Sequence, residues 1–389
     1  MASSKAKTLV IYTGGTFGMK DDGAGLKPVD RFKVSDEFSR IVPLSDMKKP
    51  EEIKSRKEIM RRFTTRKQDW NGTVDESPIT YDVYEFKRLI DSSLMNQDDW
   101  KSIAETIQKY YEDYDGFVVV MGTDTMAYAS SALSFMLENL SKPVVFTGAQ
   151  ITIFDAMSDG PENLLCSLIV STLDIPEVLL CFNKKAFRGN RVVKTDCVGL
   201  DAYTSSNMPL LVTLDTRVTL DTRVTQTESL EKQIGTLQVQ EMYPEGNEVG
   251  LLVIYPGITT EQVKNTIKDL QAVVLLTFGS GNIDGKIVQA MVDEQNNRKR
   301  LYINVTQCLK GSVTSSYQAS NALKELGAVN CSDITTEAAF TKLSYVLAKE
   351  QDFEERKKMM RTSRRGEMSD EDSERENRNS ENNQGLSQN

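Results

Sequence analysis

The sequence predicts an α/β protein with a larger N-terminal and a smaller C-terminal domain, each built on a mainly parallel sheet. Short apolar runs rich in β-branched residues alternate with segments whose apolar residues recur at helical spacing. This alternation is typical of parallel α/β layers. It stops near residue 205 and resumes near residue 250, and a chain of 389 residues is long enough for two domains that each bury a core.

The first set of elements begins with Thr8–Thr13 (TLVIYT), a continuous apolar run that ends on two glycines, as a buried strand would. Apolar residues then recur every three or four positions between residues 98 and 111, which predicts a helix. Phe117–Met121 (FVVVM) predicts a second buried strand, and the Ala-, Leu- and Met-rich segment 127–140 predicts a helix. The set is completed by predicted strands at 143–147 and 176–182 and by a helix from about Pro161.

The second set follows the same alternation. Its predicted strands lie at residues 250–255, 272–278 and 301–306. Its predicted helices lie at residues 260–270, 284–295, 316–326 and 335–349. We therefore expect an N-terminal catalytic domain over residues 1–205, a linker region over 206–247 and a C-terminal domain over 248–350.

Two segments stand apart from these domains. The linker region carries the hexad LDTRVT twice, at 214–219 and 220–225, and two copies are too few to build a solenoid. We interpret the pair as a local duplication in a strand or loop. The tail at 351–389 is poor in aromatic residues and dense in charged and amide side chains, which predicts disorder.

Composition excludes several classes of function. The formal net charge of −9 argues against a nucleic-acid surface, and no apolar run approaches the ~20 residues that span a membrane. The chain starts without the layout of a signal peptide. Its five cysteines form no CxxC pair and are odd in number, which indicates free thiols and no metal site. We expect a cytoplasmic protein.

The chain contains no histidine. This excludes Ser-His-Asp and Cys-His catalysis and HExxH zinc sites. If the protein is a hydrolase, proton transfer must fall to Lys, Tyr, Asp, Glu or a chain of hydroxyls.

Three motifs place hydroxyl or charged side chains just after a predicted strand, where the ligand crevice of an open α/β sheet lies. They are TGGT at 13–16, GTDT at 122–125 and FRGNRVVK, which ends on Lys194. Each is weak alone. TGGT lacks the Walker lysine of a phosphate loop, GTDT is also a common helix cap, and a single lysine is most often a surface ammonium.

In the order TGGT, DSS (91–93), GTDT and RGNRVVK, however, the motifs resemble the asparaginase family. The stretch 115–150 is similar to the bacterial type I enzymes and their animal cytosolic relatives. The resemblance runs from Thr8 to about Lys349. It leaves out the charged insert at 47–77, the duplicated hexad and the tail.

This resemblance implies an L-asparaginase that splits L-asparagine into L-aspartate and ammonia and needs no cofactor. It assigns the nucleophile to Thr16 and a second catalytic cluster to Thr123, Asp124 and Lys194. Hydrolysis of an unactivated amide needs both a nucleophile and a proton carrier. A lysine held beside a carboxylate could pass a proton through Thr123 and a water, which would explain catalysis without histidine.

The resemblance also implies a site for both ends of a free amino acid. Asp124, beside Thr123, is the expected partner of the α-ammonium group. Asp91, Ser92 and Ser93 are expected to bind the α-carboxylate. Alternatively, this DSS run caps the helix predicted at 98–111, and it could serve both purposes.

The sequence departs from the family pattern at two positions. Met121 stands where the family has a histidine before GTDT, and Leu26 stands where many relatives have a tyrosine on the loop after TGGT. In animal relatives a tyrosine of the C-terminal domain is implicated instead. Its match here is Tyr317. The alternative is that Tyr317 is an ordinary residue at the start of a helix.

Other functions remain open at this point. The missing histidine and the insert would suit a catalytically impaired asparagine-binding or scaffold protein, although Thr16, Thr123, Asp124 and Lys194 are all retained. An amidase or lysophospholipase acting on a larger substrate is a further alternative. By resemblance we expect a homodimer or homotetramer, in which a partner domain closes each site.

Overall fold

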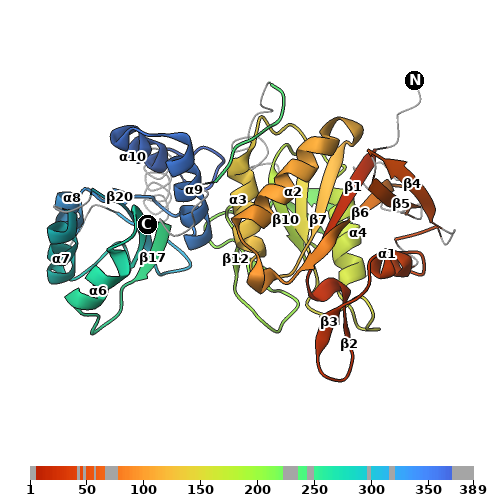
Figure 1. Ribbon diagram of the computed structural model, residues 1–389, viewed down its shortest axis with the longest axis horizontal. Helices are drawn as coiled ribbons and strands as arrows, with labels where there is room; N and C mark the ends of the chain where they lie inside the picture. Colours follow the sequence, from red (N-terminus) through yellow and green to blue (C-terminus); the bar gives the residue numbers. More distant parts are fainter. Residues whose placement is uncertain are drawn as a thin grey trace, which may run out of the picture. The chain divides into compact units, whose positions relative to one another are not determined.

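The computed structural model describes residues 6–41, 44–46, 50–56, 58–65, 78–221, 235–242, 249–295, 299–314 and 320–369. The chain divides into two compact units, residues 1–240 and 241–389, each of them α/β (Figure 1). The predicted fold class, with a larger N-terminal and a smaller C-terminal α/β domain, is confirmed. Over the described residues, every helix is too short or too polar to span a bilayer.

The larger unit contains a ten-stranded sheet whose centre is parallel. Its five central strands, in spatial order, are β10 (Val178–Phe182), β9 (Val144–Thr147), β7 (Gly116–Val120), β1 (Lys7–Gly14) and β6 (Thr80–Ile90). Figure 1 shows helices α2 (Gln97–Tyr110) and α3 (Met126–Met136) on the near face and α4 (Gly160–Val170) on the far face. Because helices cover both faces, β7, β9 and β10 are buried along their whole length and consist of nearly continuous apolar runs.

Antiparallel strands extend both sides of this centre. β5 (Glu58–Thr64) and β4 (Glu51–Ser55) follow β6, and β11 (Lys185–Arg188), β14 (Val212–Leu214) and β15 (Val218–Leu220) follow β10. The charged insert at 47–77 therefore contributes strands. The bidentate bond from Arg62 to Asp82, at 2.8 and 3.0 Å, helps to fasten β5 to β6.

The duplicated hexad is partly visible. Its first copy forms the hairpin of β14 and β15, which buries Leu214 and Val218. Most of the second copy lies outside the described residues. The segment predicted as a linker thus adds strands to the larger unit, which the sequence pattern did not indicate.

The order of the central strands creates a switch point at β1. After β1 the chain forms β6 on one side of it and β7 on the other. Ligand crevices of open α/β sheets lie at the carboxyl ends of strands beside such a point. The loops that leave these ends are residues 14–16 after β1, 91–93 after β6, 121–125 after β7 and 148–150 after β9.

The smaller unit is built on a four-stranded parallel sheet. Its strands are β17 (Val249–Val253), β18 (Ala272–Thr277), β19 (Leu301–Thr306) and β20 (Val329–Asn330). The helices around it are α6 (Thr260–Ile267), α7 (Gly285–Gln295), α8 (Ser320–Leu326) and α9 (Thr336–Lys349). Thr259 and Gln262 form a reciprocal cap at the start of α6.

The expectation of disorder from residue 351 onward is wrong for residues 351–369. Helix α10 (Phe353–Arg361) begins at Asp352, whose carboxylate accepts bonds from two backbone N–H groups. Beyond it the chain reaches Glu367, whose carboxylate lies 2.6 Å from Lys342 Nζ with both side chains fully buried. The same ammonium donates to the carbonyls of Met360 and Thr362 at 3.0 and 2.8 Å. Residues 370–389 lie outside the described residues.

Burial raises the pKa of Glu367, but the adjacent Lys342 ammonium and hydrogen bonds from backbone N–H groups outweigh it, so the pKa lies below its ordinary value. Ser369 adds two bonds to the Asp333 carboxylate, from its N–H at 2.7 Å and its hydroxyl at 2.9 Å. We call residues 352–369 the C-terminal clasp. Charged composition did not predict it because these charges are satisfied inside the unit.

Candidate active site

Glycines bring the TGGT, DSS and GTDT loops into contact. Gly15 has a φ of 84°, in the region that favours glycine, and a Cβ atom there would overlap the backbone of Gly122. A Cβ on Gly14 would overlap the backbone of Ile90, and one on Gly122 would overlap the side chain of Ser92. The TGGT, DSS and GTDT motifs, which are far apart in sequence, therefore meet at one end of the sheet.

Thr16 begins a single 3-10 turn, Thr16–Gly18, directly after the glycines. The next side chain, Phe17, is fully buried and packs edge-on against Phe38. Thr16 itself is partly exposed, and among the described residues its hydroxyl has no hydrogen-bond partner. The turn thus buries Phe17 in the core and leaves the Thr16 hydroxyl beside the loops that follow the strands.

The predicted second cluster comes together from two distant segments. Lys194 Nζ lies 2.8 Å from Thr123 Oγ1 and 2.7 Å from Asp124 Oδ1. The Lys194 side chain is 15% exposed and that of Asp124 is 64% exposed, so the ammonium is sheltered while the carboxylate faces solvent. The arrangement places a hydroxyl and a carboxylate within hydrogen-bond distance of one ammonium group.

The hairpin of β12 (Val193–Lys194) and β13 (Tyr203–Thr204) supplies Lys194. The FRGNRVVK motif leads into it. Arg188 of that motif makes a fully buried bidentate bond to Glu177 at 2.6 and 2.9 Å, which fixes the chain before the hairpin starts. On the second strand of the hairpin, directly opposite Lys194, the Tyr203 hydroxyl donates to the main-chain carbonyl of Thr123 at 2.6 Å.

Gln150 belongs to the same cluster and was missed by sequence reasoning. Thr123 Oγ1 donates to Gln150 Oε1 at 3.3 Å, and Gln150 Nε2 donates to the carbonyl of Gly199 at 3.0 Å. The Asp159 carboxylate holds this loop by accepting from the N–H groups of Gln150 and Ile151. The available signal was its position directly after a buried strand, the same signal that marked TGGT and GTDT.

The DSS run adopts a local turn. Asp91 Oδ1 accepts from the N–H and the hydroxyl of Ser93, both at 2.9 Å, and so caps the short 3-10 turn Ser92–Leu94. It does not cap the next helix: Asn96 and Asp99 form that reciprocal cap. Ser92 is buried, whereas Asp91 and Ser93 are exposed.

GTDT is not a side-chain cap either. The residue before α3 is Thr125, and it makes no side-chain cap to that helix. Its hydroxyl instead donates to the carbonyl of Ser92 at 2.8 Å, which joins the GTDT and DSS loops. The alternative interpretation of GTDT as an ordinary cap is therefore wrong.

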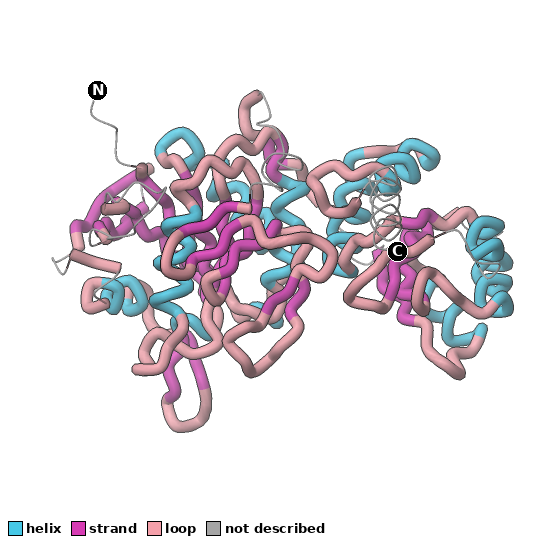
Figure 2. The backbone as a smooth tube through the Cα atoms, turned by 180° about the vertical axis from the view of Figure 1, so that it is seen from behind, coloured by secondary structure: helices cyan, strands magenta, loops and turns pink. Residues whose placement is uncertain are grey.

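The two departures from the family pattern differ in setting. Met121 is fully buried, and its N–H donates to the carbonyl of Thr147 at 2.9 Å, so its side chain occupies a packing position. Leu26 is 49% exposed on β3 (Leu26–Pro28), which forms with β2 (Met19–Asp21) the hairpin that projects from the larger unit (Figures 1 and 2). Tyr317 lies outside the described residues.

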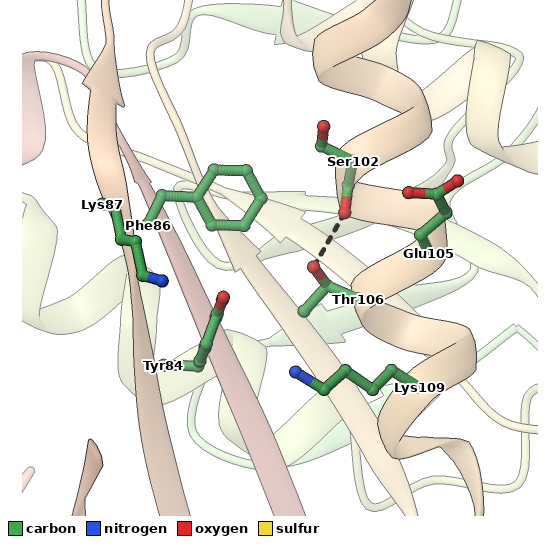
Figure 3. Close-up of a pocket in the computed structure, with 7 residues that line it drawn as sticks. All are labelled: Tyr84, Phe86, Lys87, Ser102, Glu105, Thr106 and Lys109. Atoms are coloured by element: carbon green, nitrogen blue, oxygen red, sulfur yellow. Dashed lines mark hydrogen bonds between the residues drawn. The ribbon is translucent and has the colours of Figure 1, made fainter. Parts of the chain in front are cut away.

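A separate pocket of about 350 Å³ lies between β6 and α2 (Figure 3). It is open and contains none of the motif residues. The hydroxyls of Ser102 and Thr106, which line it, already donate to carbonyls of their own helix. Within the described ranges, no three Asp, Glu or Cys side chains lie close enough together to hold a metal ion.

Comparison with known families covers nearly the whole chain. The asparaginase N-terminal model matches residues 7–226, and the glutaminase/asparaginase C-terminal model matches residues 248–360. The chain belongs to the asparaginase family. L-asparaginase 1 of Escherichia coli strain K12 is 38% identical over 373 residues, which cover 95% of this chain and 99% of that relative.

Two other relatives of this asparaginase-family chain are informative. A Homo sapiens protein named 60 kDa lysophospholipase is 37% identical over 93% of the chain, which spans 61% of that protein. The solved structure of L-asparaginase I from Vibrio cholerae is 35% identical, covers 94% of this chain and 100% of its own, and superposes with a TM-score of 0.77.

Proposed function

We propose that this asparaginase-family protein hydrolyses L-asparagine to L-aspartate and ammonia, with Thr16 as the nucleophile. The observation that carries the proposal is that Lys194 is hydrogen-bonded to both Thr123 and Asp124. The loop that holds Thr123 and Asp124 touches the backbone of the loop that leads to Thr16. The relatives named L-asparaginase and the matched family models support it. In this proposal Thr16 is the nucleophile and Lys194 is the proton carrier, so the reaction needs no histidine.

The chemistry divides into two steps. The Thr16 hydroxyl attacks the side-chain amide carbon and loses its proton. The C–N bond then breaks as the amide nitrogen takes up one proton and leaves as ammonia, with an ester formed on Thr16. Water then attacks the ester, releases aspartate and returns the proton to Thr16. Lys194 in its neutral form would accept a proton from Thr123 or a bound water, and in its charged form would return it.

Substrate recognition follows from exposure. Only Oδ1 of Asp124 is bonded to Lys194 in the structure, and the carboxylate is mostly exposed, so it has room for an α-ammonium group. Asp91 and Ser93 present polar atoms on the adjoining turn, where we propose that the α-carboxylate binds, with Ser92 as the buried base of that turn.

Ammonia release by the purified full-length protein tests this function. Wild type should release ammonia from L-asparagine, Thr16→Ala should release none, and Thr16→Ser, which keeps a hydroxyl, should retain part of the activity. Circular dichroism establishes that each variant is folded. A folded Thr16→Ala variant with near-normal turnover would sink the assignment of the nucleophile.

Because one relative is named a lysophospholipase, the same preparations should be assayed for fatty-acid release from lysophosphatidylcholine. Fatty-acid release that exceeds ammonia release would favour the larger substrate. A wild-type protein that binds asparagine without turnover would favour the impaired or scaffold alternative. The intact bonding around Thr123 argues against that alternative.

We also propose a cytoplasmic homodimer or homotetramer. Cys197 and Cys308 are exposed free thiols, which suits a reducing compartment. Met157 and Val198 are large apolar side chains that are 78% and 82% exposed in the larger unit, as residues buried by a second copy would be in an isolated chain. Light scattering with size exclusion measures the mass, and Val198→Asp should lower it.

A further inference from the structure

Tyr203 and Lys194 act on the same residue from opposite strands. They are directly paired in the antiparallel register of β12 and β13, so their side chains lie on one face of the hairpin. Lys194 donates to the side-chain oxygen of Thr123 at 2.8 Å, and Tyr203 donates to its main-chain oxygen at 2.6 Å. The hairpin thus holds both polar oxygens of Thr123.

A third bond closes this arrangement. The carbonyl of Gly199, in the loop of the same hairpin, accepts from Gln150, and Gln150 accepts from the Thr123 hydroxyl. The main-chain carbonyl of Thr123 also receives the N–H of Met126, but at 3.5 Å, a distance at which a hydrogen bond is weak. Tyr203 therefore provides the short bond that fixes the backbone of Thr123.

Tyr203 is suited to a fixed donor role. It is 3% exposed and packs edge-on against Phe182 with ring centroids 5.1 Å apart. Burial first, and the nearby Asp124 carboxylate second, raise the pKa of its hydroxyl well above the ordinary value. The hydroxyl therefore keeps its proton and stays a donor throughout the working pH range.

We propose that Tyr203 is a positioning residue that sets the Thr123 hydroxyl against Lys194 for proton transfer. Its hydroxyl is bonded to the main-chain carbonyl of Thr123, and it acts through that backbone. The proposal rests on the proposed function, since it assigns Tyr203 to the proton-transfer step of that reaction. Displacement of the Thr123 hydroxyl from Lys194 should lower the rate of the chemical step and leave the binding of the amino acid little changed.

The test is Tyr203→Phe, with Tyr81→Phe as a matched control. Tyr81 is also a buried tyrosine whose hydroxyl donates to a main-chain carbonyl, that of Leu44 at 2.8 Å, but it lies in β6 away from the motif loops. Phenylalanine fills nearly the same volume at either position, so both variants should fold and lose similar thermal stability. We expect kcat to fall about tenfold in Tyr203→Phe alone, with KM within about twofold of wild type.

A double-mutant cycle of Tyr203→Phe with Lys194→Met distinguishes a role in positioning Thr123 against Lys194 from a general contribution to the stability of the site. If Tyr203 acts through the pair of Thr123 and Lys194, its removal should cost less than about twofold once Lys194 is gone. An unchanged kcat in Tyr203→Phe, an equal loss in Tyr81→Phe, or full additivity in the cycle would overturn the inference. A wild-type protein that releases no ammonia would instead refute the proposed function.

Discussion

Gly15 and Gly122 lie backbone to backbone, so that Gly15 has no room for a side chain. Gly15→Ala should therefore push the Thr16 turn away from the GTDT loop and reduce kcat/KM by roughly 10²-fold or more. Gly23→Ala is the control, because Gly23 has a similar φ of 87° and nothing lies within 4 Å of a Cβ there. It should lose a little stability and no activity. Equal activities of the two variants would show that the loops tolerate separation.

Lys194→Met should lower kcat on the order of 10²-fold, because the variant loses the proposed proton carrier, which is bonded to Thr123. Lys185→Met is the matched control, since Lys185 forms an ion pair of the same 2.7 Å length with Asp201 near the surface. Steady-state ammonia release measures both. A similar kcat in the two variants would exclude Lys194 from proton transfer.

Asp124→Ala should act mainly on substrate binding. Its exposed carboxylate is the proposed partner of the α-ammonium, so KM for asparagine should rise at least about tenfold while kcat falls less. An asparagine analogue without the α-amino group should bind wild type and variant alike. An unchanged KM would show that the Asp124 carboxylate does not bind the α-ammonium group and interacts with Lys194 alone.

Tyr317→Phe should be severely impaired if Tyr317 supplies the hydroxyl beside Thr16, since Leu26 offers none. In that case Leu26→Tyr, on the exposed β3 strand, should restore part of the lost rate in the double variant. Full activity of Tyr317→Phe would show that Thr16 is activated by another group.

Glu367→Gln should cost about 3–5 kcal/mol of unfolding free energy at pH 7, because it leaves the Lys342 ammonium buried without a counter-charge. The control is Glu355→Gln, which removes an exposed ion pair and should cost less than about 1 kcal/mol.

The sign of the pH dependence follows from the lowered pKa of Glu367. Its stabilising contribution is fully present above the unfolded-state pKa of about 4.3 and is lost as pH falls through the folded-state pKa. Urea unfolding of the smaller unit should therefore show a difference between wild type and Glu367→Gln that shrinks below pH 4. A difference that stays constant down to pH 2 would contradict this.

Much of the fold could be predicted from strands that are buried on both faces. β7 and β9 carry continuous apolar runs, and the structure places them within a residue or so of the prediction. β4 was not predicted, because its residues (EEIKS) are mostly charged and exposed and so show no apolar periodicity. β4 forms because it pairs with β5, and a pattern within its own five residues holds no information about that partner.

The candidate site shows the same division. Motif order identified Thr123, Asp124 and Lys194, which the structure brings together, while their catalytic roles stay predictions. Gln150 was missed because an amide after a strand has no chemical signature until its partners are known. The C-terminal clasp was missed because Lys and Glu are almost always exposed, and composition treats them so.

The clasp also decides where the smaller unit ends. A chain cut after Glu350 would keep all four strands of that unit and helix α9, so it would look complete by secondary structure. Yet Lys342, in the middle of α9, would lose the Glu367 carboxylate and the carbonyls of Met360 and Thr362 together. Its side chain would then face either water or an apolar interior. The shortest self-sufficient form of the protein therefore has to extend to about Ser369.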